Sequence, residues 1–151
     1  MKNMRSMKRA ATLMLSVVML VALMPVSVKA TTITNTDYEF DTETGALVIK
    51  TDNGTTAWRD DTKISKEAVK SVEFQREDAP ILNIGAHAFD GCTNLSGTIK
   101  LNAQTKSIGE DAFKGCNSLE VIMIPTVVQS DINQAAIPVQ TDYVIYEVDG
   151  D

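Results

Sequence analysis

The sequence predicts a repeat solenoid of mixed α/β type, with about four parallel strands joined by short helical turns and a β-hairpin closing the N-terminal end. Three observations support this prediction. A twelve-residue motif occurs twice, a strand-like alternation follows each copy, and a hairpin-like segment precedes them.

The repeated motif is the strongest signal. Residues 84–95 (IGAHAFDGCTNL) and 108–119 (IGEDAFKGCNSL) are identical at seven of twelve positions and begin 24 residues apart. A period of about 20–29 residues is typical of leucine-rich repeats. The shared positions are mostly apolar or glycine, and they fall near one face of a short helical turn. We therefore expect Phe89 and Phe113 to be buried, with the glycines of each copy allowing sharp turns.

Strands with period-two alternation are predicted after each motif and once before them. Each strand has a leading apolar residue, which is Val69, Leu95 or Leu119, and its inward positions come three and five residues later. After Leu95 both positions come one residue later, because Ser96-Gly97-Thr98 adds a residue. The expected inward residues are Val72, Phe74, Ile99, Leu101, Ile122 and Ile124. A weaker copy at 132–137 should precede a last strand, a degenerate end cap, in which Tyr143 takes the leading apolar position and Tyr146 and Val148 the two inward positions.

The segment from 31 to 68 is predicted to cap the stack, and residues 69–151 to hold the repeats. Alternation on both sides of the turn-rich residues 41–45 predicts the β-hairpin. A further turn is expected at 52–54, before Trp58, and Ser65 is expected to cap a short helical turn over 65–70. Residues 31–37 are polar and rich in Thr, so we expect them to be mobile.

The first thirty residues predict a secretory signal peptide. Basic residues precede an apolar stretch from Ala10 to Met24, and the small residue Ala30 precedes the expected cut. A membrane-spanning helix needs about 20 apolar residues, and this stretch is about five residues shorter. We therefore expect cleavage, an extracellular or cell-surface location, and no stable membrane insertion afterwards.

The charge balance excludes some partners. All 20 acidic residues, but only nine of the 14 basic ones, follow Ala30, so the exported part would carry 11 net negative charges. Nucleic-acid binding depends on clustered Lys and Arg, and anionic membranes attract the same residues. We expect neither as a partner, and we interpret the acidity as solubility outside the cell.

No catalytic or metal-binding arrangement is predicted, so we expect a protein that is not an enzyme and needs no cofactor or metal. Cys92 and Cys116 share one motif position and are interpreted as small core residues. His87 takes the position of Asp111 in the other copy, so we expect it to be solvated and not to activate a thiol. The acidic runs at 52–54 and 149–151 lack the spacing of a calcium loop.

The two cysteines are expected to be free thiols. Helical turns of adjacent repeats should lie about 8–10 Å apart. That spacing exceeds the Cα separation of ~7 Å beyond which a disulfide cannot form. The oxidising compartment alone would allow a disulfide.

One candidate binding face is predicted, formed by outward side chains of successive strands. Its expected members are Ser71, Glu73, Thr98, Lys100, Val121, Met123 and Glu147. Solenoids bind partners through such extended faces, and exposed apolar residues such as Val121 and Met123 favour a partner. The alternative interpretation is that all seven are ordinary exposed strand residues.

The doubled motif, followed by Ile124-Pro125, resembles the BspA-type leucine-rich repeat family of bacterial surface proteins. The segment at 40–50 (FDTETGALVIK), with Trp58 after it, is similar to the strand pair that often opens such proteins. The resemblance covers residues 40–125. It implies a curved right-handed solenoid, secretion or surface display, and adhesion to host or matrix proteins, and it carries over no catalytic residues.

Two functional hypotheses follow. The first is a secreted or surface-associated module that binds an extracellular protein or glycan through the strand face. The second is a structural repeat unit that associates with copies of itself and has no separate ligand, suggested by the few repeats and the weak last one.

Overall fold

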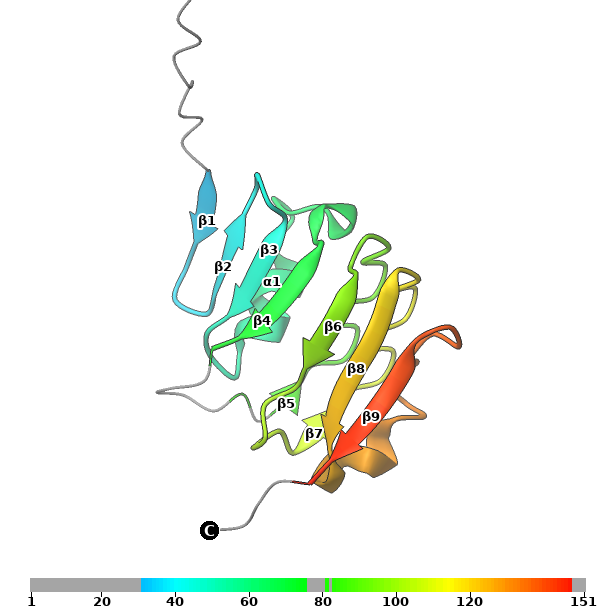
Figure 1. Ribbon diagram of the computed structural model, residues 1–151. Helices are drawn as coiled ribbons and strands as arrows, with labels where there is room; N and C mark the ends of the chain where they lie inside the picture. Colours follow the sequence, from blue (N-terminus) through cyan, green and yellow to red (C-terminus); the bar gives the residue numbers. More distant parts are fainter. Residues whose placement is uncertain (1–30, 76–80, 82, 148–151) are drawn as a thin grey trace, which may run out of the picture.

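The computed structural model describes residues 31–75, 81 and 83–147, and Figure 1 shows their arrangement. The predicted signal peptide lies outside these residues. The elements in chain order are β1 (Thr32–Thr34), β2 (Tyr38–Asp41), β3 (Ala46–Ile49), α1 (Gly54–Asp60), η1 (Lys66–Ala68), β4 (Ser71–Phe74), β5 (Asn83–Ile84), β6 (Gly97–Lys100), β7 (Ser107–Ile108), β8 (Leu119–Pro125), η2 (Thr126–Asp131) and β9 (Asp142–Tyr146).

The N-terminal segment contains the predicted hairpin and one strand more. Strands β2 and β3 pair antiparallel, which confirms the hairpin. The expectation that residues 31–37 are mobile was wrong, because β1 pairs antiparallel with β2. Ile33 packs against the core, and the Asn35 side chain accepts hydrogen bonds from the backbone N–H groups of Asp37 and Tyr38. These contacts order a segment whose polar composition alone suggested mobility.

Two local details of the helical segments differ from the prediction. The turn expected at 52–54 leads directly into helix α1, which buries Gly54, Thr55 and Trp58. Its seven residues include Gly and Thr, which are weak helix formers, so helix propensity alone does not predict it. The turn at η1 is confirmed, but Ser65 makes no capping hydrogen bond with its side chain. The Ser65 hydroxyl is bonded to the Glu67 carboxylate instead.

The longer strands of the repeats pair in parallel. Strand β4 pairs with β3, and β8 pairs with both β6 and β9. A shorter parallel pair, β5 with β7, joins equivalent positions of the two motifs. The six inward residues predicted for β4, β6 and β8 are all buried, as expected.

The sheet is interrupted between β4 and β6. These strands lie next to each other (Figure 1) but belong to separate hydrogen-bonded sheets. One backbone bond, from Ser96 N–H to Lys70 O at 3.0 Å, links the starts of the two strands. Gly97 has a φ of 73°, and the β6–β8 register shifts between Gly97 and Thr98. Such a bulge bends its strand, which accounts for the incomplete ladder.

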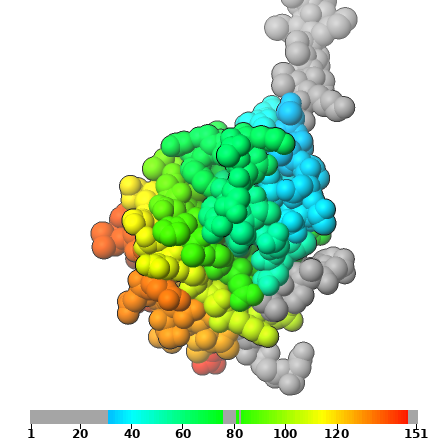
Figure 2. Space-filling view, turned by 180° about the vertical axis from the view of Figure 1, so that it is seen from behind, coloured from blue at the N-terminus to red at the C-terminus, as the bar shows by residue number. Residues whose placement is uncertain are grey.

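The motifs themselves are chains of tight turns and not the predicted helical turns. His87 and Gly91 have φ values of 55° and 80°, which end any helix after a few residues. Consecutive motifs are instead hydrogen-bonded to each other through the backbone. His87, Phe89 and Gly91 donate to the carbonyl oxygens of Glu110, Ala112 and Lys114, each at 2.8 Å. Figure 2, seen from behind, shows these segments as bands that follow the chain order.

The last strand has a register different from the prediction. Tyr143 lies opposite Ile122 and Ile145 opposite Ile124, so Ile145 takes the second inward position. Tyr146 lies opposite Pro125, on the outward side, where the prediction had it inward. Val148 is outside the described residues. Because residues 143–146 are all apolar or aromatic, alternation could not decide which side faces the core.

A stack of aromatic rings runs along the interior. The Phe89 ring lies 6.0 Å from that of Trp58 and 5.4 Å from that of Phe113, in stacked geometry. Phe74 meets Phe89 edge-on at 6.3 Å. Phe89 and Phe113 are fully buried, as predicted. Phe89 therefore connects α1, β4 and both motifs in one core.

Candidate binding face

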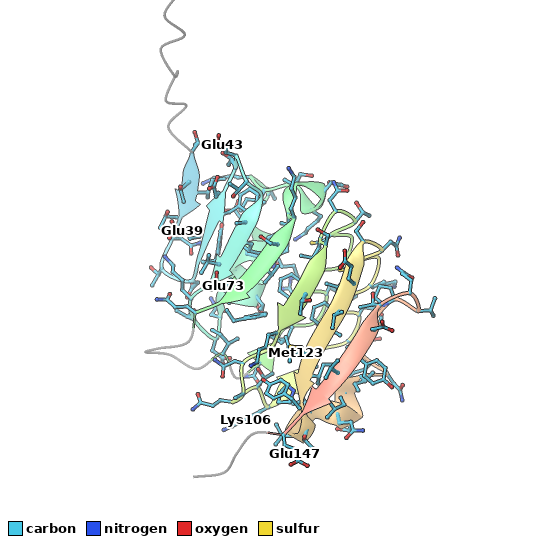
Figure 3. The ribbon with its side chains drawn as sticks, in the orientation of Figure 1. Glu39, Glu43, Glu73, Lys106, Met123 and Glu147 are labelled. Atoms are coloured by element: carbon cyan, nitrogen blue, oxygen red, sulfur yellow. The ribbon has the colours of Figure 1, made fainter. Side chains whose placement is uncertain are left out.

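The outward side chains of β3, β4, β6, β8 and β9 form one surface, here called the strand face. Period-two alternation places them opposite the core residues of the same strands. Ser71, Glu73, Thr98 and Lys100 are exposed, whereas Val121 and Met123 are half-buried. Glu147 follows the last residue of β9, and Figure 3 places it past the end of that strand. The structure thus brings six of the seven predicted residues onto the strand face and leaves Glu147 at its margin.

A groove of about 410 Å³ runs over the interruption of the sheet and is called the β4–β6 groove. Four of its lining residues are predicted face residues, two from β4 (Ser71, Glu73) and two from β6 (Thr98, Lys100). The other lining residues are Ala46, Leu47, Val48, Val72 and Phe74. The groove therefore has polar, charged edges and contains apolar side chains from the strands beneath.

The two edges of the β4–β6 groove carry opposite charges. Glu73 on β4 and Lys100 on β6 both line the groove, yet they form no ion pair with each other. Glu39 shares the cross-strand row of Val48 and Glu73, which adds a second carboxylate on the β4 side. A ligand with both a cationic and an anionic group could therefore meet a complementary charge at each edge.

Tyr146 is a face residue that the sequence analysis missed. Its hydroxyl donates a 2.7 Å hydrogen bond to the backbone oxygen of Leu101, so the side chain reaches across β8 to the end of β6. The Lys100 ammonium lies 5.1 Å from the centre of the Tyr146 ring, within the range of a cation–π contact. Tyr146 therefore helps to hold the cationic edge of the groove in place.

The β8–β9 part of the strand face is apolar. Met123 lies between Lys100 and Val144 in the strand register. Val144 is 46% exposed. Figure 3 shows Glu73 on β4 and Met123 on β8, across the interrupted part of the sheet from each other. An apolar strip thus borders the charged groove.

The cysteines are unsuited to nucleophilic chemistry. Both are free and fully buried. Burial raises the pKa of each thiol to about 12, so at neutral pH the reactive thiolate is scarce. The Cys116 thiol donates to the backbone oxygen of Phe89 at 3.1 Å.

The spacing argument that predicted free thiols was wrong, although both thiols are free. Motif segments joined by backbone hydrogen bonds lie at the spacing of neighbouring strands, about 4.8 Å. That is closer than the 8–10 Å of packed helices, so the distance between the segments does not by itself prevent a disulfide.

His87 is half-exposed, as predicted, and its Nδ1 lies 3.1 Å from the Asp90 carboxylate. Within the described ranges, no three His, Cys, Asp or Glu side chains are grouped so that they could hold a metal ion. The described part of the chain also contains no helix with the length and apolar content needed to cross a bilayer.

A match to a known family agrees with the repeat period, the shared core positions and the parallel strands. The sequence model described as "BspA type Leucine rich repeat region (6 copies)" matches residues 62–137. The chain belongs to this family. No curated protein and no solved structure matches the chain.

Membership of the BspA-type family bears on function at a coarse level. Leucine-rich repeat proteins of this type are commonly surface proteins that bind partners, and they are typically not catalytic. The matched residues include the 3-10 helix η1, strands β4 to β8 and both motifs. Both edges of the β4–β6 groove therefore lie inside the family's repeat region.

Proposed function

We propose that this BspA-type protein is exported and binds an extracellular protein, without catalysis, through the strand face. We also propose that its parallel strands and turn segments form a short solenoid, since such a stack presents an extended face. The observation that carries the proposal is the β4–β6 groove, in which predicted face residues from two strands supply opposite charges around apolar side chains.

A protein segment fits this surface better than a purely polar ligand. The Glu73 edge suits a basic side chain, the Lys100 edge an acidic one, and the strip of Met123 and Val144 an apolar one. Protein interfaces combine an apolar centre with a polar, charged rim. A glycan would use the hydroxyls and charges but would leave the apolar strip unused, so glycan binding is the competing outcome.

Direct binding tests this function. Residues 31–151, which contain every described element, would be measured against purified extracellular matrix proteins and, separately, against glycans. We expect at least one matrix protein to bind, and the variants Glu73→Lys and Lys100→Glu each to weaken that binding about tenfold. Binding to glycans alone would contradict the protein-binding proposal.

Glu43→Lys is the matched control. Glu43 is an exposed acid in the β2–β3 turn, outside the groove, so this variant makes the same charge change elsewhere. Loss of binding in Glu43→Lys equal to that in Glu73→Lys would mean that net charge matters and the groove does not. Unchanged binding in both Glu73→Lys and Lys100→Glu would show that the partner does not bind at the groove.

Export is tested by fractionating a culture into cytoplasm, membrane, wall and medium. We expect the chain outside the cytoplasm with Thr31 as its first residue, because the preceding segment has the order of a cleaved leader. An intact N-terminus in the cytoplasmic fraction would contradict export.

A further inference from the structure

We propose that the β9 edge is a self-association surface, through which two copies of this chain pair antiparallel about a twofold axis at Val144. The proposal concerns the β9 edge and not the β4–β6 groove; Val144 is shared, because its side chain also belongs to the apolar strip of the strand face. Three observations carry it: where the exposed apolar side chains gather, what β9 leaves unpaired, and how its sequence matches itself.

The exposed apolar side chains gather at one end of the molecule. Among the described residues, the strongly exposed large hydrophobic side chains are Val127, Val139, Tyr143 and Val144, with exposures from 46% to 104%. Val127 lies in η2, Val139 in the loop that follows, and Tyr143 and Val144 in β9. A hollow of about 230 Å³, lined in part by Ile132, Ile137 and Tyr143, lies at the same end. Such a concentration of exposed apolar surface is typical of an interaction site.

Strand β9 is an open edge. Among the described strands it pairs with β8 alone, whereas β8 has partners on both sides. Every second residue of an edge strand turns its N–H and C=O groups outward, where they can pair with another strand. Protection of this edge is weak within Asp142–Tyr146, because the strand contains no Pro, Lys or Arg and its one charged residue, Asp142, lies at its first position. The strand is thus fit to receive an edge of another chain.

The sequence of β9 is complementary to itself. In an antiparallel pair centred on Val144, that residue meets its own copy, Tyr143 meets Ile145, and Asp142 meets Tyr146. Apolar residues therefore face apolar ones on both sides of the sheet, and the like charges are kept apart. The two Asp142 carboxylates would be separated by four strand positions, about 14 Å, which exceeds the screening length of ~8 Å at physiological salt.

Strand β1, at the opposite end of the stack, is a poorer partner for β9 than a second β9. Strand β1 has only three residues, Thr32–Thr34, and two of them are Thr. A β1–β9 contact would bury little apolar surface and would leave β9 longer than its partner. It would also be heterologous and would produce rings or open filaments, whereas the β9 pair closes as a dimer. The dimer would join β6, β8 and β9 of the two copies in one sheet with a β4–β6 groove at each side, which raises avidity for a repetitive partner.

Sedimentation velocity on residues 31–151, which contain all described elements, tests the proposal. We expect a concentration-dependent monomer–dimer equilibrium. Its dissociation constant should fall when salt is raised, because salt screens the repulsion between two acidic copies. Val144→Glu places two carboxylates at the axis and should raise the dissociation constant at least tenfold, which corresponds to about 1.4 kcal/mol. Far-UV circular dichroism would check that this half-exposed position leaves the fold intact.

Two further variants fix the register. Thr98→Glu adds the same charge on β6, away from β9, and should leave the dimer unchanged. Val144→Cys should form a disulfide-linked dimer under mild oxidation, since opposed Cα atoms in an antiparallel pair lie about 4.5–5.5 Å apart. A strict monomer at all concentrations, filaments in place of dimers, or a dimer unaffected by Val144→Glu and not linked by Val144→Cys would overturn the proposal.

Discussion

Tyr38 is a buried residue whose polar group has one charged partner. The side chain is fully buried in the core beneath the hairpin, and its hydroxyl donates to the Asp61 carboxylate. Burial, followed by the hydrogen bond to Asp61, raises the pKa of Tyr38 to about 12. The same hydrogen bond is the main cause of the lowered pKa of Asp61. The pair therefore favours a neutral tyrosine and an ionised aspartate in the folded state.

The pair predicts a pH dependence of stability. The Tyr38 pKa is raised on folding, so its contribution is full below the unfolded value of ~10 and is lost as pH rises towards about 12. Tyr38→Phe should lower the free energy of unfolding at pH 7 by about 1 kcal/mol and should flatten the loss of stability between these pH values. Urea unfolding at several pH values measures both effects.

Tyr143→Phe is the control, because Tyr143 is exposed and lies in β9. It should retain the alkaline loss of the unsubstituted chain. If Tyr38→Phe lost stability with the same steepness as Tyr143→Phe, the Tyr38–Asp61 pair would not be the cause. The lowered pKa of Asp61 acts at the other end of the scale, where its contribution is lost as pH falls below the ordinary aspartate value.

At the scale of elements, the spacing of the motif segments depends on Gly109. A Cβ on Gly109 would lie 2.3 Å from the backbone N of Ala86, in the preceding motif. The equivalent Gly85 would place a Cβ 3.1 Å from the Thr56 hydroxyl, a side-chain atom that can move. Both glycines were expected to permit sharp turns, yet neither has a positive φ. What they permit is close approach of neighbouring backbones.

This difference predicts unequal effects of one substitution at two equivalent positions. Gly109→Ala should destabilise the chain by about 3 kcal/mol, because backbone segments that are hydrogen-bonded to each other would have to separate. Gly85→Ala should cost about 1 kcal/mol or less, because only the hydroxyls of Thr56 and Thr55, both side-chain atoms, must shift. Chemical unfolding compares the two variants directly. Equal losses of unfolding free energy in the two variants would show that the close approach of the two motifs at Gly109 does not control stability.

At the scale of the whole molecule, the core is continuous although the sheet is not. Buried residues from both sides of the β4–β6 interruption belong to one hydrophobic cluster. The rings of Trp58, Phe89 and Phe113 cross from the N-terminal cap into the repeats. We therefore expect the parts on either side of the interruption to unfold together, because side-chain packing joins them although the hydrogen-bond ladder does not.

Trp58, the only tryptophan of the chain, makes this testable. Its fluorescence reports on the cap, and far-UV circular dichroism reports on all strands. We expect the two thermal transitions to coincide, and Phe89→Leu to lower both midpoints together because Phe89 contacts both parts. Separate transitions, or a shift of one midpoint alone, would mean that the cap and the repeats unfold independently.

The parts of the fold that could be predicted are those with a local signature. The 24-residue period, the burial of Phe89 and Phe113, the hairpin, and the inward positions of β4, β6 and β8 follow from periodicity over a few residues. For the same reason, six of seven candidate face residues could be placed on the strand face, since outward positions alternate with inward ones. Their role in binding stays a prediction.

The parts that could not be predicted depend on contacts between distant segments. Strand β1 is ordered by β2, the conformation of the motifs by hydrogen bonds to the next motif, and the register of β9 by its pairing with β8. Tyr146 is a face residue because of that register. The β4–β6 groove exists because the ladder is interrupted there, which no property of β4 or β6 alone reveals.

The amino-acid order alone therefore determined the repeat, its core positions and the family, since these rest on side-chain character at fixed intervals. Only the tertiary structure decided how closely the repeats approach, where the sheet is interrupted and which strand ends the described sheet. Those features arise from backbone hydrogen bonds between residues more than twenty positions apart. Such bonds use the same N–H and C=O groups at nearly every residue, so the side-chain pattern carries little information about them.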